Sequence, residues 1–340
     1  MLFFMNDYGQ TCHPRILKAL EKTIGENING YGVDDYTEKT KKTIQELIGK
    51  PDAHVHFMVG GTPSNVATIA QILKPYEGVI CPRTAHIYRH ETGAVEATGH
   101  KLITALTEDG KLTPEIIQGL LAEFEDEHTV LPRLVFISDA TELGTVYTKA
   151  ELTALSEFCH SHDLYLFLDG ARLGAALTCE DNDLTIQDIA NLVDVFYLGG
   201  TKNGILMGEA LVFVNTELDK NFRFMIKRHN NLLAKGWLLA VQFEELLKGG
   251  KDSLWLELAK KENDMANLLR QGLEKKGYKF LGNSKTNQIF PIITLEQDKM
   301  LQEKVLFEPF RQIDDKYTCV RFCTGFGTTE EDINNLLDLL

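Results

Sequence analysis

Residues 164–172 read Leu-Tyr-Leu-Phe-Leu-Asp-Gly-Ala-Arg, and residues 193–204 read Val-Asp-Val-Phe-Tyr-Leu-Gly-Gly-Thr-Lys-Asn-Gly. Each stretch is a short, mostly apolar run that ends in a turn containing glycine. Runs of this kind are typical of strands buried on both faces of a parallel sheet, whereas half-exposed strands alternate apolar and polar residues. The two stretches therefore predict parallel strands whose carboxyl ends are followed by Asp169 and Lys202.

The rest of the first 245 residues repeats this rhythm. Further apolar runs lie at 78–81, 134–138 and 210–214, and amphipathic patterns typical of helices lie at 113–124 and 149–160. Alternation of buried strands with helices is the signature of repeated βαβ units. We therefore expect an α/β fold with a mostly parallel sheet and helices on both of its faces.

The pattern changes after about residue 245, near the Gly249-Gly250 pair. The later segments are a long amphipathic helix, two isolated strands and a terminal helix with Thr328 or Thr329 as its cap. In order, the helix and the strands are expected at 254–276, 290–294 and 318–322. We therefore expect a large α/β domain over residues 1–248 and a smaller α+β domain over residues 249–340.

The charge balance argues against several classes of partner. The chain has 35 basic and 49 acidic residues, a formal net charge of −14, which opposes binding to nucleic acids and anionic membranes. No apolar stretch approaches the roughly 20 residues of a membrane span. Neither a disulfide framework nor a zinc-binding spacing is visible, so we expect a cytoplasmic protein without a metal site. The six cysteines are scattered, at positions 12, 81, 159, 179, 319 and 323.

A glycine pair precedes the helical pattern that begins near residue 62. The segment 59–65 reads Val-Gly-Gly-Thr-Pro-Ser-Asn. Thr62 suits the N-cap and Pro63 the first helical position, where the missing N–H costs nothing. Free backbone N–H groups and the helix dipole then form a site for a phosphate group. The alternative is an ordinary loop-to-helix turn that binds nothing.

Asp169 and Lys202 each have an ordinary and a chemical interpretation. Ligands of parallel sheets bind outside the carboxyl ends of the strands, where a carboxylate suits a protonated ring nitrogen. Asp169 alternatively caps the following helix. A lysine among small residues suits imine formation when partial desolvation favours its neutral amine. Lys202 is alternatively a surface lysine in a turn.

Two further side chains are candidates for a site. His86 follows the strand expected near residue 79, where an imidazole stacks on a flat cofactor or moves protons. Arg321 stands between Val320 and Phe322 in an expected strand, and its planar fork suits a carboxylate. The alternatives are a structural histidine and an arginine that points into solvent.

Together these motifs resemble the L-threonine aldolase branch of the β-eliminating lyase family, which belongs to the aspartate-aminotransferase-like, fold type I enzymes dependent on pyridoxal 5'-phosphate. The likeness runs through nearly the whole chain. It is carried by Asn6-Asp7, His13-Pro14, Tyr31-Gly32, Asp34-Asp35, Gly60-Gly61-Thr62 with Ser64-Asn65, His86-Ile87-Tyr88 with Glu91, the segment 141–147, Asp169-Gly170-Ala171-Arg172, Gly200-Thr201-Lys202-Asn203-Gly204 and Arg321.

The resemblance implies a seven-stranded-type sheet sandwiched by helices, and a role for each matching residue. Lys202 forms an imine with the cofactor, Asp169 pairs with the pyridine nitrogen, and His86 stacks on the ring and is a candidate base. The phosphate is held by Gly61, Thr62 and Asn65. Asn6, Arg172 and Arg321 bind the substrate, with Arg172 also near the cofactor.

The reaction implied is retro-aldol cleavage of a small β-hydroxy amino acid to glycine and an aldehyde. β-Elimination, or another amino-acid lyase reaction on the same site, remains the alternative because the cofactor supports several bond cleavages. The family is homodimeric or homotetrameric with shared sites, so Tyr31 and Lys227 or Arg228 are expected to reach a partner's site. This sequence departs from the family at Asn6, Ala94 and Thr201.

Overall fold

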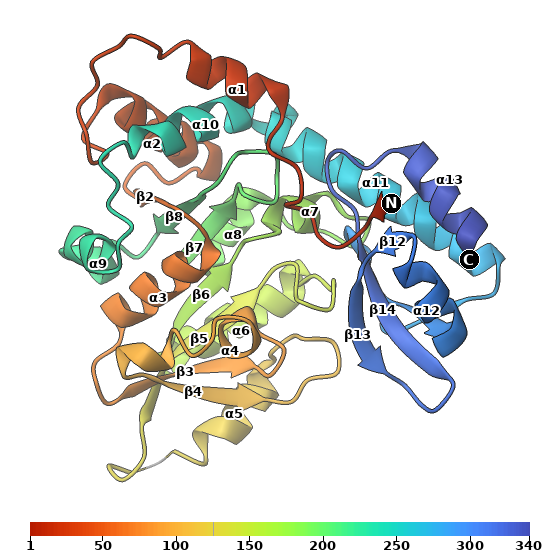
Figure 1. Ribbon diagram of the computed structural model, residues 1–340. Helices are drawn as coiled ribbons and strands as arrows, with labels where there is room; N and C mark the ends of the chain where they lie inside the picture. Colours follow the sequence, from red (N-terminus) through yellow and green to blue (C-terminus); the bar gives the residue numbers. More distant parts are fainter. Residues whose placement is uncertain (125) are drawn as a thin grey trace.

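The computed structural model describes residues 1–124 and 126–340, and its centre is a seven-stranded sheet (Figure 1). The strands follow one another across the sheet in the order β2, β8, β7, β6, β5, β3, β4. Their bounds are β2 His54–Met58, β8 Glu209–Phe213, β7 Val195–Gly199, β6 Tyr165–Asp169, β5 Leu131–Ser138, β3 Glu77–Pro82 and β4 Lys101–Ala105. The predicted α/β fold with a mostly parallel sheet is confirmed.

One strand of this sheet runs against the others. β8 pairs antiparallel with both of its neighbours, β2 and β7, so β2 has the same direction as the five parallel strands. The remaining pairs, from β7 through β4, are parallel. The carboxyl ends of β2, β6 and β7 therefore meet at one edge, and β8 begins at that same edge.

Alternate residues of the central strands pack into two separate hydrophobic clusters, one on each face. In β6, Leu166 and Leu168 enter one cluster and Phe167 enters the other. In β7, Phe196 belongs to the first cluster and Tyr197 to the second. Burial on both faces explains why these strands read as continuous apolar runs.

Helices cover both faces of the sheet. Residues of α2, α5, α6, α7, α8 and α10, with the first turns of α11, complete the first cluster, and residues of α3, α4 and α9 complete the second. The bounds are α1 Pro14–Glu21, α2 Asp35–Ile48, α3 Gly61–Ile72, α4 His86–Arg89, α5 Pro114–Leu121, α6 Lys149–Ser161, α7 Leu173–Thr178, α8 Ile186–Leu192, α9 Phe222–Arg228, α10 Trp237–Leu247 and α11 Leu254–Lys275.

The C-terminal part is a small antiparallel sheet with its own core. β14 lies between β10 and β11, it also pairs with β13, and β9 is added beyond β11. The third hydrophobic cluster fills the space between this sheet and the helices α11 and α13. The bounds are β9 Lys279–Phe280, β10 Gln288–Ile289, β11 Pro291–Thr294, α12 Leu295–Gln302, β12 Val305–Leu306, β13 Glu308–Gln312, β14 Tyr317–Cys323 and α13 Glu330–Leu339.

The N-terminal segment crosses to the C-terminal part. β1 (Leu2–Phe3) pairs with β12, and Phe4 is buried in the third cluster against Phe322. In Figure 1 the N-terminus accordingly lies beside β12 and α13. The domain boundary near residue 248 stays a prediction.

The helix caps agree with the sequence in one case and correct it in another. Thr329 caps α13 in a capping box with Asp332. Thr62, in contrast, is not the cap of α3: the cap is Gly60, and the helix begins at Gly61, two residues earlier than predicted. A Cβ on Gly61 would lie 3.1 Å from the hydroxyl of Tyr197, so the absence of a side chain lets the helix start close to the sheet.

No helix among the described residues is long and apolar enough to span a membrane. All six cysteines are free, which agrees with the absence of a disulfide framework in the sequence.

A carboxyl group is buried in the core just beyond β5. Asp139 is 2% exposed, its N–H donates to the carbonyl of Asp169, and its Oδ1 accepts the N–H of Tyr147 at 3.4 Å. Burial raises the pKa of Asp139 from 3.8 to about 8. The fold therefore favours the neutral carboxyl, and this contribution to stability is lost as the pH rises from the unfolded pKa through the folded pKa.

We predict that the variant Asp139→Asn no longer loses stability as the pH rises, because its side chain does not ionise. The free energy of unfolding of the variant, relative to the wild type, should increase by a few kcal/mol between about pH 4 and pH 8. Urea unfolding across this range measures the difference. The exposed Asp52→Asn is the control, and a pH-independent difference for Asp139→Asn would show that the native carboxyl ionises normally.

Candidate active site

The sheet edge formed by the ends of β2, β6 and β7 collects the predicted cofactor residues (Figure 1). Asp169 is the last residue of β6, and Lys202 follows β7 by three positions. Val59 and Gly60 join β2 to α3, whose first residue is Gly61. Parallel strands bring these three positions together although they are far apart in the sequence.

Asp169 is buried and is not the cap of the next helix. Its Oδ1 accepts the N–H of Ala171 at 3.0 Å, and its Oδ2 accepts the amide of Asn65 at 3.2 Å. The N-cap of α7 is instead Arg172. Burial, followed by the charge of Asp169, raises the pKa of the Tyr197 hydroxyl well above its usual value.

A chain of side chains connects Asp169 to His86. The amide of Asn65 also donates to Oε1 of Glu91 at 2.9 Å, and the same oxygen contacts Nδ1 of His86 at 2.8 Å. Because a carboxylate only accepts, the Nδ1 of His86 carries the proton in this pair. The imidazole is held through one nitrogen, which leaves Nε2 available.

The main-chain N–H of His86 makes a second contact, with a different acidic residue. The N–H of His86 donates to Oε1 of Glu142 at 2.9 Å, and the hydroxyl of Ser138 donates to that oxygen as well. Burial raises the pKa of Glu142, and the charge of Asp169 adds to this effect. The position of His86 therefore depends on two acidic residues, Glu91 and Glu142.

Lys202 is half-buried, so it is not an ordinary surface lysine. Within the described part of the chain, no hydrogen bond or ion pair is formed by its side chain. Burial lowers the pKa of Lys202, the charge of Arg172 lowers it further, and Asp7, Asp169 and Glu209 oppose the shift. A depressed amine pKa favours nucleophilic attack by lysine.

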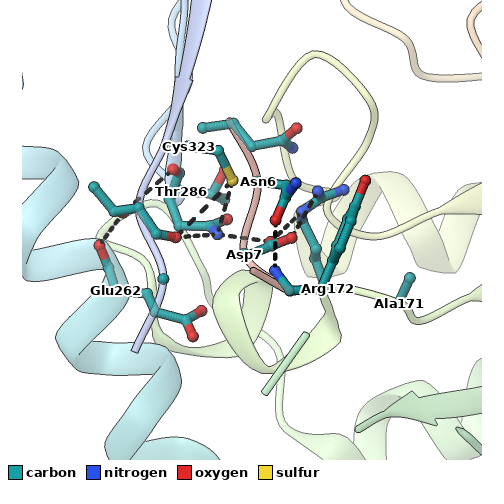
Figure 2. Close-up of polar contacts among 12 residues, drawn as sticks. Asn6, Asp7, Ala171, Arg172, Glu262, Thr286 and Cys323 are labelled. Atoms are coloured by element: carbon teal, nitrogen blue, oxygen red, sulfur yellow. Dashed lines mark hydrogen bonds and ion pairs between the residues drawn. The ribbon is translucent and has the colours of Figure 1, made fainter. Parts of the chain in front are cut away.

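Arg172 forms a buried, two-point ion pair with Asp7 (Figure 2). Its Nε donates to Oδ2 of Asp7 at 2.7 Å and its Nη2 donates to Oδ1 at 3.1 Å. The amide of Asn287 donates to the same carboxylate at 2.9 Å. Burial opposes ionisation, but Arg172 and then Lys202 outweigh it, and the pKa of Asp7 falls to about 2.

Arg321 lies on β14 and reaches the N-terminal segment. Its Nη1 donates to Gln288 at 3.1 Å, its Nη2 donates to the carbonyl of Met5 at 3.4 Å, and it pairs with Glu308 on the neighbouring strand β13. Its buried Nε has no hydrogen-bond partner among the described residues. It does not point freely into solvent.

The remaining candidates have local contacts. The side-chain oxygen of Asn6 accepts the N–H of Tyr8 at 3.1 Å. The main-chain N–H groups of Gly61 and Thr62 lie in the first turn of α3, where the helix supplies no acceptor. No group of three or more His, Cys, Asp or Glu side chains among the residues described is arranged to hold a metal ion.

Sequence reasoning gave no role to several acidic residues of this site. Asp7 and Glu91 stood inside the quoted motifs, but only as neighbours of Asn6 and His86. Glu209 and Glu308 belonged to no motif. Asp7 and Glu91 contact Arg172 and Asn65, which are distant in the chain. Glu209 and Glu308 are placed by strand register, which the sequence pattern does not reveal.

Comparison with known proteins identifies the family of this chain. Residues 17–296 match the family described as β-eliminating lyase. The low specificity L-threonine aldolase of Pseudomonas sp. (strain NCIMB 10558) is 36% identical over 272 residues, which cover 78% of this chain and 76% of that protein. The corresponding Pseudomonas aeruginosa protein is 35% identical over 274 residues, covering 79% and 77%.

A solved structure extends the likeness to the full length. The Leishmania major threonine aldolase superposes with a TM-score of 0.97 at 43% identity, covering 100% of this chain and 98% of that one. With a family match over residues 17–296 and such relatives, the chain belongs to the β-eliminating lyase family, whose members are pyridoxal-phosphate-dependent lyases.

Proposed function

We propose that the protein is a low-specificity L-threonine aldolase that cleaves small β-hydroxy amino acids to glycine and an aldehyde with pyridoxal 5'-phosphate. The observation that carries the proposal is the meeting of Asp169, Lys202 and the Glu91-bound His86 at one sheet edge. Relatives at 35% to 43% identity that bear the names of threonine aldolases support the choice of reaction.

The residues present fit the cofactor. Gly61 and Thr62 offer backbone N–H groups at the start of the twelve-residue helix α3, which suits a phosphate. Asn65 Oδ1 is buried without a partner among the described residues. Asp169 would accept a hydrogen bond from the pyridine nitrogen, and Lys202 would hold the aldehyde carbon.

When bound, pyridoxal phosphate supplies an electron sink for the pair released as the Cα–Cβ bond breaks. The carboxylate of Asp169 would hold the ring nitrogen and would favour the protonated ring. Asn65 holds that carboxylate in place through its 3.2 Å hydrogen bond. The chain thereby contributes charge placement and orientation to the reaction.

His86 is the proposed base for the β-hydroxyl proton. Its Nδ1–H is bound by Glu91, so its Nε2 lone pair is free to accept a proton. The carboxylate of Glu91 favours the imidazolium that results, as a buried acidic partner does for other catalytic histidines. The side chain of His86 is 38% exposed, which leaves one side of the ring accessible.

Arg172 and Arg321 differ in how many of their N–H groups remain for the substrate carboxylate. Asp7 already takes Nε and Nη2 of Arg172, so Arg172 offers mainly Nη1 to a ligand. Arg321 has an unpartnered Nε among the described residues and only one charged partner, the partly exposed Glu308. We assign the substrate carboxylate to Arg321, with Asn6 and Arg172 beside it.

β-Elimination on the same site is the second candidate. It starts from the same bound substrate but removes the α-proton, and it yields a keto acid and ammonia rather than glycine and an aldehyde. The family description itself, β-eliminating lyase, keeps this candidate open. Product identification separates the two reactions.

We also propose a homodimer or homotetramer in the cytoplasm with shared sites. Tyr31 has a positive φ of 63°, it is 46% exposed, and Lys227 Nζ lies 5.4 Å from its ring centre. Arg223 donates to the carbonyl of Tyr31 at 3.0 Å, and Phe224 nearby is 76% exposed. This group of exposed aromatic and basic side chains suits contact with a second copy.

We predict that wild-type protein supplied with the cofactor is yellow and converts L-threonine to acetaldehyde and glycine. Lys202→Ala should lose the covalently held chromophore and at least 1,000-fold of the activity, roughly the scale seen on removing a catalytic nucleophile. Visible spectra and product analysis measure both. Lys42→Ala, on the exposed face of α2, is the control; keto acid and ammonia as products would select elimination.

We predict that Glu91→Gln retains the chromophore but lowers kcat by about 100-fold, because the imidazolium of His86 loses its anionic partner. Gln keeps the size and an acceptor oxygen, so the packing around Asn65 is preserved. Stopped-time assays with L-threonine give kcat. An unchanged kcat would exclude His86 as the base that depends on Glu91.

We predict that Arg321→Gln raises KM for L-threonine about 10- to 100-fold with a smaller change in kcat, because a charge-assisted bond to the carboxylate is lost. Arg311→Gln, on the exposed side of β13, is the matched control. Steady-state kinetics measure both constants. Equal KM values for the wild type and Arg321→Gln would place the substrate carboxylate elsewhere.

A further inference from the structure

A buried glutamate lies directly beneath the loop that carries Lys202. Glu209 is the first residue of β8 and stands opposite Gly199 of β7 and Met58 of β2. It is 4% exposed. Its Oε2 accepts the N–H of Gly200 at 2.8 Å, two residues before Lys202. The carboxylate of Glu209 therefore lies at the end of the β7–β8 pair, where the loop that carries Lys202 begins.

The loop is fastened to the same place by a second set of bonds. The N–H of Thr201 donates to the carbonyl of Gly208 at 3.1 Å, and the N–H of Gly208 donates to the hydroxyl of Thr201 at 2.9 Å. Residues 200 and 201 are thus tied to residues 208 and 209. This closed arrangement fixes the main chain that leads into Lys202.

The carboxylates near Lys202 differ in whether each forms an ion pair of its own. The charge of Arg172 disfavours the proton on Lys202, whereas Asp7, Asp169 and Glu209, in this order, favour it. Asp7 is matched by Arg172 in a two-point ion pair. In the proposed function, on which this step rests, Asp169 is matched by the pyridine nitrogen. Among the residues that the structure describes, Glu209 forms no ion pair, and its charge favours the protonated form of Lys202.

We propose that Glu209 is a positioning residue that holds the Lys202 loop and whose negative charge retains the proton on the Lys202 nitrogen. Its side chain contacts the main chain of the loop at Gly200, so it acts through Lys202. Its role deepens the proposed function, because the protonation state of this nitrogen governs how readily a substrate amine displaces Lys202.

The two groups must titrate together. Burial raises the pKa of Glu209 to about 7, while the N–H of Gly200, the hydroxyl of Thr201 and the charge of Lys202 lower it and Asp169 raises it. The phenol of Tyr197 lies in the field of both Asp169 and Glu209. As Glu209 ionises, Lys202 holds its proton more strongly, so each midpoint depends on the other group.

The test compares wild type with Glu209→Gln in the cofactor-loaded full chain. Gln keeps an acceptor for Gly200 and removes the charge. The pH midpoint of the visible absorbance should fall by about one unit, the usual scale for loss of a nearby opposite charge. Glu209→Asp, which restores the charge, should bring the midpoint back toward that of the wild type.

A matched control excludes a general effect of losing a buried carboxylate. Glu77 is also 4% exposed and its Oε2 accepts the N–H of Lys74 at 2.8 Å, but it begins the parallel strand β3 and so lies at the opposite sheet edge. Glu77→Gln should leave the midpoint unchanged. Equal midpoints for Glu209→Gln and wild type would overturn the role of Glu209.

A second measurement does not depend on the cofactor. In the full chain without pyridoxal phosphate, the rate at which an amine-reactive acylating reagent labels Lys202, followed by peptide mass spectrometry across pH, should show the same downward shift in Glu209→Gln. An unshifted labelling midpoint would refute the inference even if the protein bound no cofactor. Failure to take up the cofactor, by contrast, would refute the proposed function alone.

Discussion

The ion pair between Asp7 and Arg172 is the interaction on which the assembly of this site depends. Burying two charges stabilises a protein only when their remaining hydrogen-bonding capacity is filled. Asp7 accepts two bonds from Arg172 and one from Asn287. The three residues come from the N-terminal segment, the turn after β6 and the loop before β10, so one carboxylate joins parts of the chain that share no strand pairing (Figure 2).

This pairing connects the residues proposed to bind the substrate with those proposed to bind the cofactor, which lie on different sheets. The segment that carries Asp7 also offers the carbonyl of Met5 to Arg321, while β1 pairs with β12. The N-terminal segment thus contacts the large sheet through Arg172 and the small sheet through Arg321. Both arginines therefore contact the same segment, which connects the proposed site of the substrate carboxylate with the charges around Lys202.

The sequence predicted the strands and the strand-end residues because both depend on local pattern. Continuous apolar runs revealed β5, β6 and β7, and position at a carboxyl end singled out Asp169 and Lys202. It failed at the start of α3: the predicted cap at Thr62 was wrong, and the helix begins at Gly61, which lies close to Tyr197 of another strand. Short strands such as β12 and acidic partners such as Glu209 gave no pattern to detect, because they are defined by register alone.

The acidic residues found only in the structure follow one rule. Three basic groups of the site lie under the influence of a carboxylate: His86 contacts Glu91, Arg172 contacts Asp7, and the charge of Glu209 acts on Lys202. In a poorly solvated site a positive charge costs much less when its partner is already fixed. The carboxylates are held by main-chain or amide N–H groups, so they need not reorganise when a proton moves. The carboxylates are thereby in place before a ligand arrives.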